Sequence, residues 1–463
     1  MNNQSRASST GKYLNTGNGF CLSYIDLEHP DYVAVIEPDT AFWSLVKKDQ
    51  LGEIISGNII VDKLKMHLKG MNKEMETLRF KLKPSAVYFN PTEQCNLNCP
   101  YCYIPSRIRK QGRHMSWKKI DEAFQILKGF FGESLPKRQK PQIVFHGSEP
   151  LMNKDVVFRA IETYGKDFSF GVQTNGTLLE QKDFDFLSSN DVMIGLSIDG
   201  STEEISDQTR KNWNNAGTFK KLLKALEICK GYPLLSVICT ATKHNIKSLI
   251  EIVDFFHANH VSNCLINQVR CTLEGGRQVK PSDSETAEMF IKALDRTYEL
   301  FKQTGRKLII ANFANILLGI VAPSARRLMC DISPCGGGRC FFAVSAKGDV
   351  FPCSEFIGLK SFKGGNLFKD DLSEILNSTP FQTVTKRKIE DIKPCNKCAI
   401  RHFCGSPCPA EAFEINGDVT HPGAFCEFYE EQVRYAFRLI ADGKENDYLW
   451  DNWDDGTSEV FRF

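Results

Sequence analysis

Between residues 86 and 301 the chain alternates short apolar runs with amphipathic stretches of helical period. The apolar runs occupy residues 86–90, 142–146, 168–174, 192–198, 234–240 and 264–269. The amphipathic stretches occupy residues 117–131, 154–164, 180–189, 218–229, 246–259 and 284–301. Strand–helix alternation at this spacing predicts a parallel sheet, and six units predict a partial (β/α)6 barrel of the TIM type. The predicted fold class is therefore α/β.

The two ends of the chain break this pattern. Residues 1–18 are polar and rich in Gly and Ser, which predicts a disordered N-terminus. A small α+β element is expected next, with strands in 20–27 and 32–38 and helices in 47–55 and 61–78. Loops, glycines and cysteines dominate after about residue 325, before a final helix and an acidic aromatic tail. The predicted divisions are 1–18, 19–82, 83–325 for the barrel, 326–430 for a loop-rich cysteine-dense domain, and 431–463.

Composition and charge narrow the class of protein. Apolar residues make up 42% and charged residues 25% of the chain, and the net charge is +2. These values are ordinary for a globular domain and predict no nucleic-acid partner. The most apolar stretch, 308–322, carries Asn312 and Asn315 and is shorter than the ~20 residues of a membrane span. We expect a buried strand and helix there, a cytoplasmic location, and no membrane partner, because the N-terminus has no apolar signal core.

Seventeen cysteines are therefore unexpected. In a reducing compartment they predict metal sites rather than a disulfide framework. Some stand alone in apolar surroundings and are expected to pack as small hydrophobic side chains: Cys21, Cys229, Cys239, Cys264 and Cys271. The others form groups, one between residues 95 and 102 and a larger one between residues 330 and 426.

The first group, Cys95, Cys99 and Cys102, directly follows the first predicted barrel strand. Three thiolates within eight residues suit a four-iron cubane cluster, and three ligands on four irons leave one iron open for chemistry. A structural zinc site with His114 as the fourth ligand is the alternative. Polar or Gly-rich clusters also follow other predicted strands, where barrel chemistry is placed: GSEP at 147–150, QTNGT at 173–177 and SIDG at 197–200.

Together with these clusters, the run CNLNCPYC resembles the signature of radical S-adenosylmethionine enzymes. The resemblance implies that the open iron chelates S-adenosylmethionine and that a 5′-deoxyadenosyl radical abstracts a substrate hydrogen. GSEP is similar to the family's Gly-Gly-Glu-Pro motif, with Ser148 in place of the second glycine, and Arg210 matches an arginine that binds the cofactor carboxylate. The implied cofactor-binding residues are Tyr101, Gly147, Ser148, Glu149, Gln173, Asn175, Ser197, Asp199 and Arg210.

The second cysteine region would suit zinc ribbons by spacing alone. The whole string, however, resembles the seven-cysteine SPASM extension, which implies two auxiliary four-iron clusters and three clusters in all. The resemblance assigns to the outer cluster Cys395, Cys398, Cys404 and Cys426. It assigns to the inner cluster Cys335, Cys353 and Cys408. The fourth inner ligand stays open between Cys330, which we favour, Cys340 beside an apolar strand, and an open iron.

Relatives that carry this extension mostly modify peptides and proteins. One branch oxidises a sulfatase Cys or Ser to formylglycine and has an aspartate directly after the Pro-Cys turn. Here Ser354 holds that position, and Glu355 would point the other way if the segment is extended. The sequence therefore favours a maturase that forms a thioether or other cross-link in a ribosomally made precursor peptide, with formylglycine formation as the alternative.

The resemblance also implies a reduced flavodoxin- or ferredoxin-type electron donor. Residues 19–82 are long enough to recognise a leader peptide, or they cap the barrel. A non-catalytic zinc-binding adaptor is a further alternative. It would explain the cysteines but not the polar clusters that follow the strands.

Overall fold

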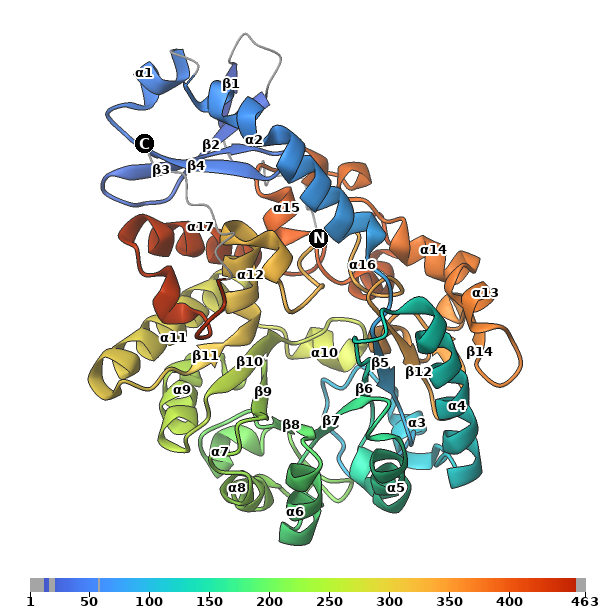
Figure 1. Ribbon diagram of the computed structural model, residues 1–463. Helices are drawn as coiled ribbons and strands as arrows, with labels where there is room; N and C mark the ends of the chain where they lie inside the picture. The colour runs from blue at the N-terminus through green and yellow to red at the C-terminus, as the bar shows by residue number, and fades with distance from the viewer. Residues whose placement is uncertain (1–11, 16–20, 57–58, 455–463) are drawn as a thin grey trace.

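The computed structural model describes residues 12–15, 21–56 and 59–454 (Figure 1). Its central feature in this part of the chain is a sheet of order β11-β10-β9-β8-β7-β6-β5-β12-β13-β14. The predicted barrel strands are β5 (Ala86–Phe89), β6 (Gln142–Phe145), β7 (Ser169–Thr174), β8 (Met193–Ser197), β9 (Leu235–Ala241) and β10 (Asn263–Gln268). Consecutive members pair in parallel, which confirms the predicted α/β barrel fold.

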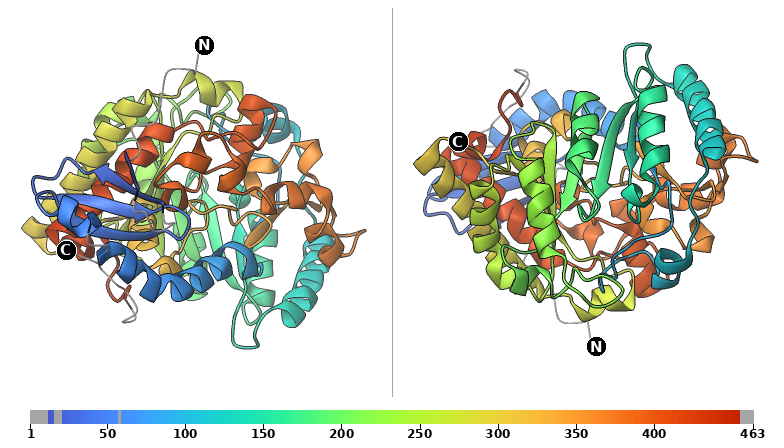
Figure 2. Two further views of the ribbon diagram at one scale, coloured as in Figure 1. Left: turned by 90° about the horizontal axis from the view of Figure 1, so that it is seen from above. Right: turned by 90° about the horizontal axis from the view of Figure 1, so that it is seen from below.

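The predicted helices lie on the outer face of this curved sheet (Figure 2). They are α4 (Trp117–Ser134), α5 (Lys154–Tyr164), α6 (Gln181–Ser189), α8 (Phe219–Ile228), α9 (Leu249–Ala258) and α11 (Asp283–Thr304). Shorter helices lie in the connections: α3 (Ser106–Gln111), η2 (Pro150–Asn153), α7 (Glu203–Ser206), η3 (Ile246–Ser248) and α10 (Glu274–Gln278). Aromatic packing joins helix to sheet, since the Phe124 ring on α4 lies 5.3 Å from Phe89 and 6.2 Å from Phe145.

The apolar stretch at 308–322 forms β11 (Ile309–Ile310) and α12 (Ala311–Val321), as predicted. Its two asparagines bond backbone groups. Asn312 pairs with both backbone groups of Ile266 on β10, and Asn315 accepts from the backbone N–H groups of Arg327 and Leu328. Burying the amides costs little when they are satisfied in this way. Within the described ranges, no helix is both long and apolar enough to cross a bilayer.

The N-terminal element differs from its prediction. It is an antiparallel sheet of β1 (Lys12–Asn15), β2 (Cys21–Asp26), β3 (Tyr32–Glu37) and β4 (Phe42–Lys47), followed by α1 (Leu51–Ser56) and α2 (Ile59–Glu76). The π-helical turn η1 (Thr77–Lys81) leads on to the barrel. The prediction missed β4, because a turn at residues 38–41 lets its apolar residues pair with β3. Predicted disorder over 1–18 falls mostly outside the described residues, although 12–15 form β1.

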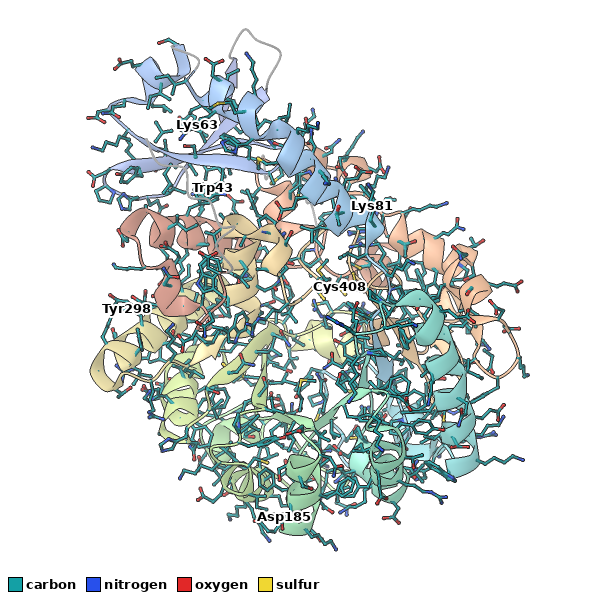
Figure 3. The ribbon with its side chains drawn as sticks, viewed as in Figure 1. Trp43, Lys63, Lys81, Asp185, Tyr298 and Cys408 are labelled. Atoms are coloured by element: carbon teal, nitrogen blue, oxygen red, sulfur yellow. The ribbon has the colours of Figure 1, made fainter. Side chains whose placement is uncertain are left out.

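Both faces of this sheet are covered. Apolar side chains on one face, among them Val35 and Phe42, pack with Leu64 of α2. The other face presents Trp43, whose indole Nε1–H donates to the carbonyl of Ile320 on α12 at 2.8 Å (Figure 3). Its ring lies 5.4 Å from that of Phe437. The element is therefore fastened onto the end of the barrel.

The cysteine-dense region continues the main sheet. Strand β12 (Phe341–Val344) pairs in parallel with β5, and β13 (Asp349–Phe351) and β14 (Gly365–Asn366) extend it antiparallel. Its short helices are η4 (Pro323–Ala325), η5 (Ser354–Phe356), η6 (Lys360–Phe362), α13 (Leu372–Leu376), α14 (Thr379–Thr385), η7 (Ile389–Asp391), η8 (Cys395–Lys397), α15 (Arg401–Cys404) and α16 (Pro409–Asn416). The predicted last helix is α17 (Cys426–Asp442), followed by η9 (Glu445–Tyr448). The end of the aromatic tail, 455–463, lies outside the described residues.

Candidate iron–sulfur and cofactor site

The first cysteine loop leaves the end of β5 and is held from several sides. Its Cys95 amide donates to the Arg109 carbonyl at 2.9 Å, and the Trp213 indole donates to the Cys95 carbonyl at 2.8 Å. Burial raises the pKa of the Cys99 thiol to about 11, although Arg210 opposes that rise. Burial raises the pKa of Cys95, and negative charge on Glu149, Cys99 and Cys102 adds to the rise, so the three thiols are close neighbours.

The three thiols suit a four-iron cluster that leaves one iron open. Structural zinc would need a fourth ligand. His114, the fourth ligand considered for zinc, is exposed. The residues present therefore fit a four-iron cluster.

The GSEP turn after β6 is built around Gly147 and Glu149. Gly147 has φ of 103°, and a side chain there would meet the Asn90 amide, which lies 2.1 Å from the position of a Cβ atom. The buried Glu149 carboxylate accepts from Thr174 Oγ1 and the Asn175 amide, both at 2.7 Å. The Glu149 side chain thus joins this turn to the end of β7.

Two more residues predicted to bind the cofactor, Ser148 and Asn175, contact the first cysteine loop or the residues just before it. Ser148 Oγ donates to the Glu93 carbonyl just before the loop, at 2.7 Å. The Asn175 side-chain amide donates to Asn96 Oδ1 at 2.8 Å and lies 3.8 Å from the Cys95 sulfur. The turns after β6 and β7 therefore meet at the first cysteine group.

Arg210 and Asp199 form a buried ion pair beside Cys99. Arg210 Nε lies 2.9 Å from Asp199 Oδ2, with side-chain exposures of 7% and 1%. The Tyr101 hydroxyl also donates to Asp199, and negative charge on Cys99 acts on Arg210. Sequence reasoning placed these residues at the cofactor but did not foresee that Asp199 would hold both Tyr101 and Arg210.

Two predicted residues lie within strands rather than in the turns. Ser197 is the last residue of β8, and Gln173 lies inside β7. Gln173 lines a cavity of about 1020 Å³ that also reaches Ser236 and Asn263, near the amino ends of β9 and β10. Gln173 thus borders the barrel interior, and β7 ends at Thr174, where the apolar run at 168–174 also ends.

The later cysteines separate into two sets through their mutual electrostatics. Burial raises the pKa of Cys404, and negative charge on Cys426, Cys398 and Cys395 adds to the rise, so the four residues predicted for the outer cluster lie near one another. In the second set, burial raises the pKa of Cys353, and negative charge on Glu355, Cys330 and Cys335 adds to the rise. Burial also raises the pKa of Cys340, and negative charge on Cys335 adds to that rise. Cys330 stays the predicted fourth inner ligand, with Cys340 and an open iron as the alternatives.

Glu355 corrects one expectation. Ser354–Phe356 is a 3-10 turn rather than an extended segment. The side chains of Ser354 and Glu355 therefore do not alternate between opposite sides, as they would in an extended segment. Glu355 Oε1 lies 3.8 Å from Arg270 Nε, and its buried Oε2 has no hydrogen-bond partner among the described residues. Burial raises the pKa of Glu355 to about 7, although Arg270 opposes the rise.

Glu355 belongs to a central polar cluster made of Tyr103, Arg270, Glu355 and Glu411. Burial raises the pKa of Tyr103, and negative charge on Glu355 adds to the rise. Burial acts to lower the pKa of Arg270, but negative charge on Cys408, Glu355 and Glu411 outweighs it. Cys102, Cys353 and Cys408 all respond to the charge of Glu355, so the cluster lies between the first and the inner cysteine groups. Cys408 itself lies near the centre of the molecule (Figure 3). Sequence reasoning missed Arg270 and Tyr103, although Arg270 follows the end of β10.

The fold and these sites define an iron–sulfur enzyme built on a partial α/β barrel. Residues 89–256 match the radical SAM superfamily, and residues 335–399 match the SPASM iron–sulfur cluster-binding domain. The chain belongs to the radical SAM superfamily and carries a SPASM domain. Both matches confirm the predicted cofactors, [4Fe-4S] clusters and S-adenosylmethionine. The individual ligand assignments and the domain boundaries stay predictions.

Two relatives in sequence span most of the chain. An uncharacterized protein of Archaeoglobus fulgidus is 40% identical over 89% of this chain and 93% of its own length. A cysteine-type anaerobic sulfatase-maturating enzyme of Clostridium perfringens is 26% identical over 78% of this chain and 98% of its own.

Solved structures share the fold. Native anSMEcpe with bound AdoMet and Kp18Cys peptide superposes with a TM-score of 0.68 at 22% identity, covering 78% of this chain and 99% of that one. Streptococcus suis SuiB bound to precursor peptide SuiA gives 0.57 at 13% identity, covering 85% and 95%.

Proposed function

We propose that this protein modifies a ribosomally made precursor peptide, forming a thioether or another intrapeptide cross-link. The observation that carries the proposal is the central polar cluster, where Arg270 and the unpartnered carboxylate oxygen of Glu355 lie between two cysteine groups. A polar anchor at this place suits a substrate held between a radical source and an electron acceptor. The peptides in the anSMEcpe and SuiB structures support a peptide substrate.

The first site is proposed to bind the radical-generating cofactors. Cys95, Cys99 and Cys102 would hold the cluster, and S-adenosylmethionine, when bound, supplies the 5′-deoxyadenosyl radical that takes a hydrogen atom from the substrate. Arg210, oriented by its ion pair, would bind the cofactor carboxylate. The backbone of residues 147–149 would accept from its amine.

The grouped cysteines between residues 330 and 426 are proposed to hold auxiliary clusters that serve electron transfer. Each cross-link removes two hydrogens from the peptide. One would leave as the abstracted atom and the other as a proton, and the auxiliary clusters, when bound, would supply an acceptor for the released electron. A reduced flavodoxin- or ferredoxin-type protein would supply the electron for the first cluster. The proposed auxiliary ligands are Cys330, Cys335, Cys353, Cys395, Cys398, Cys404, Cys408 and Cys426.

A second candidate function, oxidation of a Cys or Ser to formylglycine, gains from the position of Glu355. Ser354 stands where sulfatase maturases are expected to carry an acid, but the neighbouring Glu355 brings a carboxylate to the same cysteine turn. The 26% identity to a sulfatase-maturating enzyme also favours this candidate.

Mass spectrometry after anaerobic reaction separates the two functions. The reconstituted protein would be incubated with S-adenosylmethionine and a reductant. The substrates are a cysteine-rich peptide encoded beside its gene and a synthetic peptide with a sulfatase active-site cysteine. We expect the first peptide to lose two hydrogens per cross-link and its cysteine to resist alkylation. An aldehyde on the second peptide would overturn the cross-linking proposal in favour of formylglycine formation.

Variants of the two neighbouring residues test the polar anchor. Glu355→Gln should lower kcat/KM at least tenfold, since a charged acceptor contributes roughly 1.5–3 kcal/mol. Ser354→Ala is the matched control, and because Ser354 Oγ has no hydrogen-bond partner in the described residues, most turnover should remain. Equal activity of both variants would remove Glu355 from the substrate site.

A further inference from the structure

Arg387 lies in the loop after α14, and its side chain is buried in neutral surroundings. Its guanidinium Nε donates to the Val419 carbonyl at 2.6 Å, and Nη1 donates to the Ser406 carbonyl at 2.9 Å. Nη2 donates to Ser406 Oγ at 3.2 Å and to the His421 carbonyl at 2.9 Å. In the described part of the chain no carboxylate pairs with Arg387, which is 6% exposed. The N–H groups of the guanidinium therefore have hydrogen-bond partners, but no carboxylate among the described residues balances its positive charge.

A buried cation without an anion is costly, so a negative partner is expected. The nearby Arg79 illustrates the usual solution, because it forms two hydrogen bonds of 2.8 Å with Glu390. Around Arg387 the negative groups are cysteines. Burial lowers the pKa of Arg387, and this fall is opposed by charge on Cys335, Cys408, Cys395 and Cys404. These four belong to the inner and the outer auxiliary groups alike.

The hydrogen bonds of Arg387 also connect the loops that carry both groups. Ser406 lies between Cys404 of the outer group and Cys408 of the inner group. Ser333, two residues before another inner cysteine, donates its hydroxyl to the Arg387 carbonyl at 3.2 Å. The side chain of Arg387 therefore holds the loop between Cys404 and Cys408, and its main-chain carbonyl holds Ser333 near Cys335, so Arg387 contacts loops of both groups.

We propose that Arg387 is a positioning residue that acts as the shared counter-cation of the two auxiliary clusters and raises the reduction potential of both. Reduction adds one electron, and hence one negative charge, to a cluster. A nearby cation stabilises the reduced form more than the oxidised form. Removing the cation should make each cluster harder to reduce. The proposal rests on the cluster assignment and not on the identity of the substrate.

A redox titration followed by electron paramagnetic resonance tests this proposal without turnover. The triple variant Cys95→Ala, Cys99→Ala, Cys102→Ala serves as the background, so that only the auxiliary clusters respond as dithionite delivers one electron to each. Adding Arg387→Met should shift both reduction equilibria at least tenfold toward the oxidised form, about 59 mV for each tenfold step of a one-electron couple. Arg387→Lys keeps the charge and should stay within threefold of the background.

Arg339 provides a matched control. It is also buried and donates to backbone carbonyls, those of Cys335, Leu78 and Pro334, and its cysteine neighbours are on the inner side alone. Arg339→Met should therefore shift one of the two equilibria and leave the other within threefold. A shift of both by Arg339→Met, or of one by Arg387→Met, would overturn the shared role.

Iron content keeps the test decisive if Arg387→Met assembles poorly. Unchanged potentials in an iron-replete Arg387→Met protein would refute the proposal. If that variant loses auxiliary iron, the Arg387→Lys variant tests the proposal instead. Full iron content in Arg387→Lys, with reduction potentials near those of the background, supports the role of Arg387 as a counter-cation. Loss of iron, or a tenfold shift despite the retained charge, shows that Arg387 is a structural clamp only.

Discussion

Replacing Arg210 with methionine would leave Asp199 as a buried carboxylate without its cation. The two charged atoms are 2.9 Å apart, and at an effective dielectric constant of about 20 their attraction is about 6 kcal/mol. Desolvation offsets part of this attraction, so removal of one partner from a buried pair costs roughly 3–5 kcal/mol. We expect Arg210→Met to lose that much free energy of unfolding, and S-adenosylmethionine affinity to fall about ten- to a hundredfold.

The assay is urea unfolding of the reconstituted protein under anaerobic conditions, followed by circular dichroism, with calorimetry for cofactor binding. The double variant Arg210→Met, Asp199→Asn removes both charges and should recover at least ~2 kcal/mol relative to the sum of the single losses. Lys220→Met is the matched control. Its ammonium, 82% exposed, lies 3.4 Å from Glu203, and such pairs contribute about 0–1 kcal/mol.

Two results would refute this reasoning about Arg210. A loss below about 1 kcal/mol would mean that the ion pair contributes little to folding, as exposed pairs do. Cofactor affinity within twofold of the parent protein would mean that Arg210 does not contact the cofactor carboxylate. The first result concerns the role of Arg210 in folding and the second its role in cofactor binding, so one role can be refuted without the other.

Two further predictions concern the first site. Replacing Cys95, Cys99 and Cys102 with alanine should remove about four of about twelve irons and abolish S-adenosylmethionine cleavage while the auxiliary clusters remain; iron analysis and product chromatography check this, and cleavage that persists would contradict the site. Gly147→Ala should destabilise the turn by roughly 1–3 kcal/mol and weaken cofactor binding, because φ is 103° and the new Cβ would meet the Asn90 amide; unchanged urea unfolding and binding would contradict the close approach.

Local sequence patterns were sufficient for the barrel. Each of its strands is a short apolar run bounded by turn residues, and each major helix repeats apolar residues at helical spacing, so neighbouring residues alone carry the signal. The N-terminal strand β4 (Phe42–Lys47) was missed because its pairing with β3 depends on a tight turn. The cysteine-dense region gave little local signal, since its order comes from β12 joining β5 and from loops packed around polar groups.

What the sequence determined by itself was the chemistry: the three-cysteine loop, the SPASM spacing, and therefore the kind of cofactor. These signals are visible in the sequence because each set of ligands needs a fixed local spacing. Tertiary structure alone decided which side chains connect the cysteine groups in space. Glu355 meets Arg270 because a 3-10 turn and the end of a distant barrel strand pack together. Arg387 bonds the carbonyls of Ser406, Val419 and His421 because folding brings these distant segments together, which no local sequence pattern shows.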